Sequence, residues 1–258
     1  MIGASRSTAA VVLAALAALL APSHSASQGV SPEETQAEAV RREYEILRDA
    51  MYNSEPLQTL ELLYGQALDS LNQAELPPRT KALWGSRIEF LVARGYQAAG
   101  EKPKAASHYE EGIACLERVP ECKFFSEGWR MKSEHIGQLC LVKGLGFLLA
   151  NGRKVVGYAA QAMELDPKNA GAQIIVAASK VYPPLIFGGN PRTGIELMQK
   201  ALAMGTAAQD DLFNIYSGIG MAFSKLRKTE EARGWFVKAL ELYPGNAFVR
   251  SELEKVGE

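Results

Sequence analysis

The sequence contains few of the residues on which most catalytic and metal sites depend. It has 3 cysteines and 3 histidines in 258 residues, and His24 lies in the N-terminal segment, which leaves only His108 and His135 beyond it. A zinc site needs three or four ligands, and a catalytic site needs a nucleophile, an acid or base, and a group that orients them. We therefore expect no enzyme activity, no cofactor and no metal site.

An excess of basic charge is also missing. The chain has 28 Lys plus Arg against 29 Asp plus Glu, and no block of like charges interrupts it. Because nucleic-acid binding normally requires a basic patch that neutralises phosphates, we expect no nucleic-acid partner.

No hydrophobic run is long enough to cross a membrane. The longest, Ala9–Ala21, holds 13 residues, fewer than the roughly 20 that a spanning helix needs. Arg6 precedes this run and small polar residues follow it, as in a secretory signal peptide. We predict a signal peptide over residues 1–27, cleaved near Ala26 or Ser27. The mature protein is then exported and soluble, in the periplasm or cell envelope; an uncleaved membrane anchor is the alternative.

Alternating β-branched runs bounded by turns are absent, whereas helical periodicity is clear near the C-terminus. Small and aromatic residues recur there at helical spacing, and a proline closes the pattern: Tyr216, Ile219, Gly220, Phe223, Ala232, Phe236, Ala239 and Pro244. This segment resembles a tetratricopeptide repeat (TPR), a unit of about 34 residues that forms two antiparallel helices.

Weaker copies of the pattern precede it, the clearest ending at Ala162 and Pro167. The matches predict helical hairpins over residues 33–74, 79–118, 126–166, 168–205 and 209–243, with a capping helix over 246–257. We expect residues 28–258 to form a single all-α domain, an α-solenoid of TPR-like hairpins.

The fourth repeat contains an insertion with the sequence YPPLIFGGNP, residues 182–191. Its prolines and glycines set the backbone, while Asn190 and Pro191 are typical of a helix start, so we expect an ordered loop. Two interpretations of its apolar tip stay open. The tip covers the neighbouring repeat, or it contacts a partner, a ligand or a second copy of the chain through Tyr182, Leu185, Ile186 and Phe187.

An insertion of this kind in an exported repeat array is similar to those of exported bacterial repeat proteins. These include the helical T component that accompanies some periplasmic TRAP-type solute transporters. The resemblance implies a role associated with solute transport.

The TPR resemblance also implies that the first helix of each hairpin lines a concave groove. The groove candidates are Arg87, Phe90, Arg94, Gln97, Cys140, Gly144, Phe147, Ile174, Asn214, Ser217, Met221 and Lys225. Cationic ends with an apolar middle suit an extended peptide or an amphipathic anion.

The three cysteines allow one short disulfide. Cys115 and Cys122 flank a predicted helix end at Pro120, and an exported protein can keep a disulfide between them. Three reduced, buried thiols, with Cys140 among them, are the alternative, because sequence does not fix connectivity.

Three functional hypotheses follow. The first is an exported, non-enzymatic scaffold that binds a protein or peptide partner in the periplasm or cell envelope, including transporter components. The second is a binding component for a small hydrophobic or amphipathic ligand, associated with a periplasmic solute transport system. The third is a protein whose loop drives self-association into a homo-oligomer. An enclosed apolar cavity favours the second hypothesis, whereas an open groove with exposed arginines favours the first.

Overall fold

The computed structural model of the chain describes residues 32–257, so the predicted signal peptide lies outside the described residues. From Glu33 onward the chain forms one compact unit. Each hairpin pairs two helices: α2 (Pro32–Tyr52) with α3 (Leu57–Gln73), α4 (Pro78–Ala98) with α5 (Lys102–Glu117), α6 (Ser126–Lys143) with α7 (Leu145–Leu165), α8 (Ala170–Val181) with α9 (Pro191–Ala203), and α10 (Gln209–Lys225) with α11 (Thr229–Leu242).

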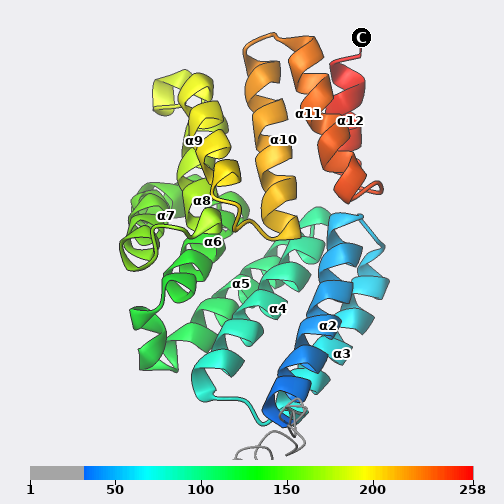
Figure 1. Cartoon of the computed structure of the whole chain (residues 1–258), viewed down its shortest axis with the longest axis vertical. Coiled ribbons are helices and arrows are strands. Elements are labelled where there is room, and N and C mark those ends of the chain that lie inside the picture. The colour runs from blue at the N-terminus through cyan, green and yellow to red at the C-terminus, as the bar shows by residue number, and fades with distance from the viewer. Residues whose placement is uncertain (1–31, 258) are drawn as a thin grey trace, which may run out of the picture. The chain divides into compact units, whose positions relative to one another are not determined.

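The last helix, α12 (Ala247–Lys255), follows the fifth hairpin, and short 3-10 turns occur at Pro120–Phe124 and Leu185–Phe187. Residues 32–257 contain no strand. Neighbouring hairpins pack in chain order (Figure 1), which confirms the prediction of an all-α, solenoid-like stack of TPR-like hairpins. In this range, none of the helices combines the length and the apolar character that crossing a membrane requires.

The repeat residues act as close-packing positions. Phe236 is fully buried in α11, and a Cβ added to Gly220 of α10 would lie 2.6 Å from its ring. Ala232 and Ala239, one turn on either side of Phe236, are also fully buried. The small residues thus let the two helices approach closely, which explains why they recur in the pattern.

The insertion in the fourth hairpin is ordered, as predicted. The Asn190 side chain accepts a hydrogen bond from the Thr193 amide at 3.2 Å and caps α9, with Pro191 as the first helical residue. Gly188 has a φ of 84°, a region that favours glycine, and a Cβ on Gly189 would lie 2.1 Å from the Pro183 carbonyl oxygen. The loop backbone therefore has one well-defined path.

The tip of this insertion faces solvent. Leu185, Ile186 and Phe187 are 76%, 85% and 75% exposed. They do not cover the neighbouring repeat, so the first interpretation of the loop is wrong. Lys225 holds the base of the loop, because its Nζ donates hydrogen bonds to the carbonyl oxygens of Val181 and Tyr182 at 2.7 and 2.6 Å.

The first and last hairpins are in direct contact, which the sequence did not predict. The ring of Tyr52, at the end of α2, stacks on Tyr243 with centroids 4.7 Å apart and meets Phe213 edge-on at 5.1 Å. The Asn246 Nδ2 donates to the Tyr52 carbonyl oxygen at 2.6 Å, and the Gly245 amide donates to Asn53 Oδ1 at 2.9 Å. In Figure 1 the blue turn after α2 accordingly lies beside the red turn before α12.

The expected disulfide is not formed, because all three cysteines are free thiols. Cys115 faces α4, where a Cβ on Gly85 would lie 3.3 Å from its sulfur. Cys122 is buried instead in a cluster with Leu116 and Met131. Each thiol has its own packing environment, and burial raises the pKa of Cys115 to about 11, which keeps it protonated.

Candidate ligand-binding cavity

The first helices of all five hairpins border one cavity of about 510 Å³. This volume lies in the range of pockets that hold small molecules. Eight residues predicted to contact a ligand or partner line it: Arg87, Phe90, Arg94, Gln97, Ile174, Tyr182, Asn214 and Ser217. Phe248 of α12 and Tyr52 of α2 also reach it, so the contact between the first and last hairpins forms part of the wall.

Most of the lining is apolar. Its hydrocarbon surface comes mainly from α4, α6, α8 and α10, through Phe90, Leu91, Met131, Leu141, Ile174, Ile175, Ala178 and Phe213. Gly137 leaves additional room on α6, because a Cβ there would meet only Val155, at 3.7 Å. A ligand in this cavity would bury hydrocarbon surface, which is favourable at about 25 cal/mol per Å².

Five of the predicted groove residues lie outside the cavity lining. Gly144 ends α6 with a φ of 81°, and Cys140 is buried in that helix. Phe147 packs beside the buried residues of α4 and α5, and Met221 packs between hairpins. Lys225 binds the loop carbonyls described above. Gly144, Met221 and Lys225 lie beyond the lining residues of α6 and α10, whereas Cys140 lies between the lining residues Gln138 and Leu141 but is not part of the lining.

Other lining residues escaped the sequence analysis, notably Tyr44, Tyr52, Arg130 and Glu134. In α6, Arg130, Glu134, Gly137 and Leu141 follow helical spacing, so their common face was readable from the sequence. The missing information was which face turns inward.

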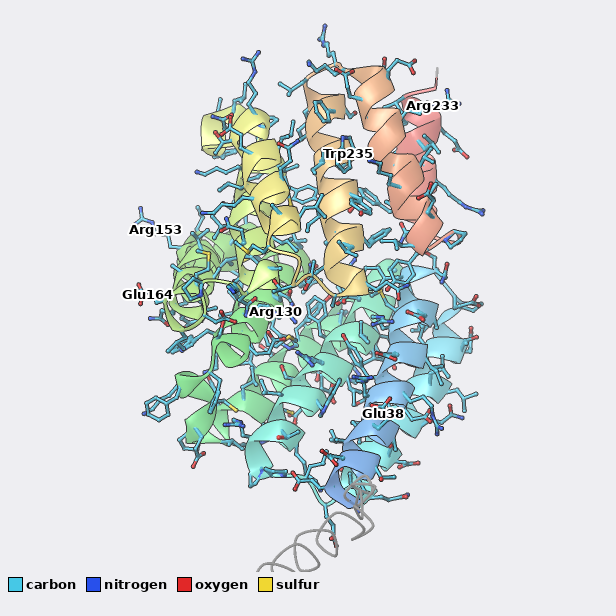
Figure 2. All side chains as sticks on the ribbon, in the orientation of Figure 1. Glu38, Arg130, Arg153, Glu164, Arg233 and Trp235 are labelled. Carbon is cyan, nitrogen blue, oxygen red and sulfur yellow. The ribbon has the colours of Figure 1, made fainter. Side chains whose placement is uncertain are left out.

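Arg130 is the centre of a buried ion network. It is 8% exposed and forms two hydrogen bonds with the Glu127 carboxylate, at 2.9 and 2.6 Å, and one with Glu134, at 2.6 Å. Arg87 donates to Oε1 of Glu127, the oxygen that also accepts the 2.6 Å bond from Arg130. Figure 2 shows Arg130 among the helices, whereas Arg153 extends outward from α7. A Cβ on Gly171 would lie 2.5 Å from Arg130 Cδ, so the glycine makes room for this arginine.

The network sets the charge of its carboxylates. Burial raises the pKa of Glu134 to about 7; the charge of Arg130 opposes this rise, while those of Asp211 and Glu127 add to it. Burial also acts to raise the pKa of Glu127, but the charges of Arg130 and Arg87 outweigh it and hold that pKa far below its usual range. Glu127 is therefore ionised and pairs with both arginines, while Glu134 carries only part of a negative charge near neutral pH.

The histidines are structural. His135 is fully buried, its Nε2 lies 2.9 Å from Ser86 Oγ, and burial lowers its pKa to about 3, so the ring is neutral. His108 lies against Glu89, with 2.7 Å between Nδ1 and Oε2, and stacks on Tyr96. Residues 32–257 contain no group of three or more side chains placed to hold a metal ion.

Comparison with known proteins adds little beyond the fold. No family model and no curated protein matches the chain. The solved structures that it resembles include TTC0263, a thermophilic TPR protein of Thermus thermophilus, with 17% identity over 87% of this chain and 98% of that one and a TM-score of 0.49. BtubC (BKLC) from P. vanneervenii has 17% identity over 82% and 91% of the two chains and a TM-score of 0.39.

These likenesses are too distant to carry a function, and neither structure is a TRAP T component, so that resemblance stays a prediction. The helical hairpins and their contacts define the class directly. The chain is a TPR-like helical-repeat protein with a cavity bordered by the first helices of its hairpins.

Proposed function

We propose that this protein is a non-enzymatic binding protein that holds a small, mainly apolar ligand in the cavity bordered by its five hairpins. The N-terminal segment exports it, and it delivers or senses its ligand in the periplasm or cell envelope, in association with a solute transport system. One observation carries the proposal: Tyr52, which stacks on Tyr243, forms part of the wall of a mostly apolar cavity of about 510 Å³.

The same observation ranks the ligand hypothesis above a peptide groove. A groove that steers an extended peptide needs several free cations, yet two of the three arginines in the described lining, Arg87 and Arg130, are bound to Glu127, which leaves Arg94. A small ligand requires instead a concave, mostly hydrocarbon surface with a few polar groups that orient it. The apolar walls of α6 and α8, together with Gln97, Ser217 and other polar groups of the lining, fit that description.

Filling the cavity should abolish binding. Gly137→Leu places a side chain in the space beside Val155, and we expect it to weaken the binding of the neutral apolar probe N-phenyl-1-naphthylamine at least tenfold. The probe is titrated by fluorescence, and native mass spectrometry of residues 28–258 from an exporting host reports any ligand that co-purifies.

Gly157→Leu is the matched control. Gly157 is exposed in α7 with no atom within 4 Å of an added Cβ, so this variant should bind the probe as the original protein does. Saturable binding that Gly137→Leu leaves unchanged, or no binding by the original protein, would contradict the proposal.

A second function is supported by the loop tip. Leu185, Ile186 and Phe187 are at least 75% exposed on a turn whose base is fixed by Lys225. Exposed apolar groups are costly in water, and a pre-ordered loop loses little entropy on binding. We propose that this tip docks into an apolar groove of another envelope protein, such as a transporter component.

The loop is tested separately from the cavity. We expect Phe187→Ser to abolish photo-crosslinking from position 185 to a single envelope protein, because the largest apolar side chain of the tip is lost. Leu149→Ser is the control, since Leu149 is 77% exposed on α7. If the crosslinked species is a second copy of this chain, the tip is a self-association surface instead.

A further inference from the structure

We infer that the ligand is an amphipathic anion whose negative charge is bound by Arg94; this inference rests on the proposed cavity function. The described lining contains three cations, Arg87, Arg94 and Arg130. Glu127 pairs with two of them. Arg94 forms neither an ion pair nor a hydrogen bond with any side chain or carbonyl of residues 32–257. Leaving a partly buried guanidinium without an anion is energetically unfavourable, and a bound carboxylate would supply the missing hydrogen-bonded partner.

The surroundings of Arg94 offer further donors. Its guanidinium carbon lies 6.0 Å from the ring centroid of Phe90, one turn earlier on α4. Burial raises the pKa values of Tyr52 and Tyr182; the Asp210 charge adds to the rise at Tyr52, and the Arg94 charge opposes it at both phenols. Both phenols line the cavity and are neutral, so they can donate hydrogen bonds to an anion beside Arg94.

Tyr182 links the cavity to the inserted loop. Tyr182 lies in the cavity lining and is 46% exposed, so a ligand in the cavity can contact it. Pro183, immediately after it, prevents the helix from continuing and fixes the point at which α8 ends. The insertion thus adds a phenol to the cavity that Arg94 also lines.

The cavity is electrostatically uneven. Of its two carboxylates, Glu134 pairs with Arg130 in the ion network, whereas the Asp210 charge acts on both Glu134 and Tyr52 and raises the pKa of each. An anion is therefore repelled by these two carboxylates and attracted to Arg94. Leu141, Ile175 and Ala178 remain for the hydrocarbon body. This arrangement selects a molecule with one anionic head group and an apolar tail, the chemistry of a fatty-acid-like carboxylate.

The charge requirement is tested with a matched pair of probes. Dodecanoate and 1-dodecanol have the same carbon chain and differ in the head group, and both are measured by displacement of N-phenyl-1-naphthylamine. We expect the original protein to prefer dodecanoate. Arg94→Met should weaken dodecanoate binding about tenfold or more, a loss of about 1.4 kcal/mol, and change dodecanol binding less than about twofold. Arg94→Lys should restore part of the preference.

The possible results separate the inference from the function on which it rests. Retained dodecanol binding shows that Arg94→Met is folded. If dodecanoate and dodecanol bind equally well before and after Arg94→Met, the anion site is refuted while the cavity function stands. If the neutral naphthylamine itself does not bind to the original protein, the cavity function fails first and the anion site fails with it.

Discussion

Replacing Arg130 by methionine is expected to destabilise the fold by about 3–5 kcal/mol, because it breaks a buried ion network in which Glu134 loses its arginine partner and Glu127 keeps only Arg87. Arg130 makes three hydrogen bonds of 2.9 Å or less to these two carboxylates. The Arg87–Glu127 pair remains but serves only one of them. Urea unfolding followed by circular dichroism measures the loss of free energy of unfolding.

Arg153→Met makes the same chemical change at an exposed position of α7 (Figure 2), and we expect it to alter stability by no more than about 0.5 kcal/mol. Adding Glu134→Gln to Arg130→Met should recover part of the loss, because Glu134 pairs with no other arginine of the described residues, whereas Glu127 still pairs with Arg87. Equal effects of Arg130→Met and Arg153→Met would show that the network contributes nothing to folding.

The helices were predictable because their signals are local. The closing prolines and the small residues around Phe236 located the last hairpin, and Asn190 with Pro191 located the start of α9. Each signal acts within a few residues of the backbone that it shapes, through capping, ring geometry or close packing. The hairpin boundaries therefore agree with the structure to within a few residues.

The contact between the first and last hairpins was not predictable in this way. Asn246 donates to the Tyr52 carbonyl across 194 residues. Whether those residues meet depends on the small rotations between all of the intervening hairpins, which add up along the stack. The prediction consequently described a groove, and it missed the contribution of α2 to the cavity.

The burial of the ion network was the other feature that could not be predicted from the sequence. Glu127, Arg130 and Glu134 lie at spacings that equally suit a solvated ion-pair row on a helix surface. The position of Gly171, which leaves room for Arg130, distinguishes the buried case, but that contact joins two different hairpins. The disulfide between Cys115 and Cys122 was wrongly predicted for a related reason, since their separation along the chain says nothing about which way each thiol faces.

Gly112→Ala is expected to cost about 3 kcal/mol, the upper end of the range for overpacking a core. A Cβ on Gly112 would lie 2.1 Å from Cε1 and 2.4 Å from Nε2 of His135. That ring cannot withdraw easily, because it is fully buried, bonded to Ser86 and packed edge-on against Phe90 at 5.4 Å. We expect a lower urea midpoint with an unchanged slope.

Gly157→Ala is the same substitution at another glycine, and we expect it to have the opposite effect on stability. Gly157 lies inside α7, is exposed, and has no atom within 4 Å of an added Cβ, so alanine should stabilise the helix by about 0.5–1 kcal/mol. The difference between the two variants in free energy of unfolding then measures the cost of the clash between α5 and His135. The intrinsic preference of alanine for helices cancels in this difference. If both variants are stabilised alike, the His135 ring has moved aside, and the tight packing of α5 against α6 does not hold this histidine in place.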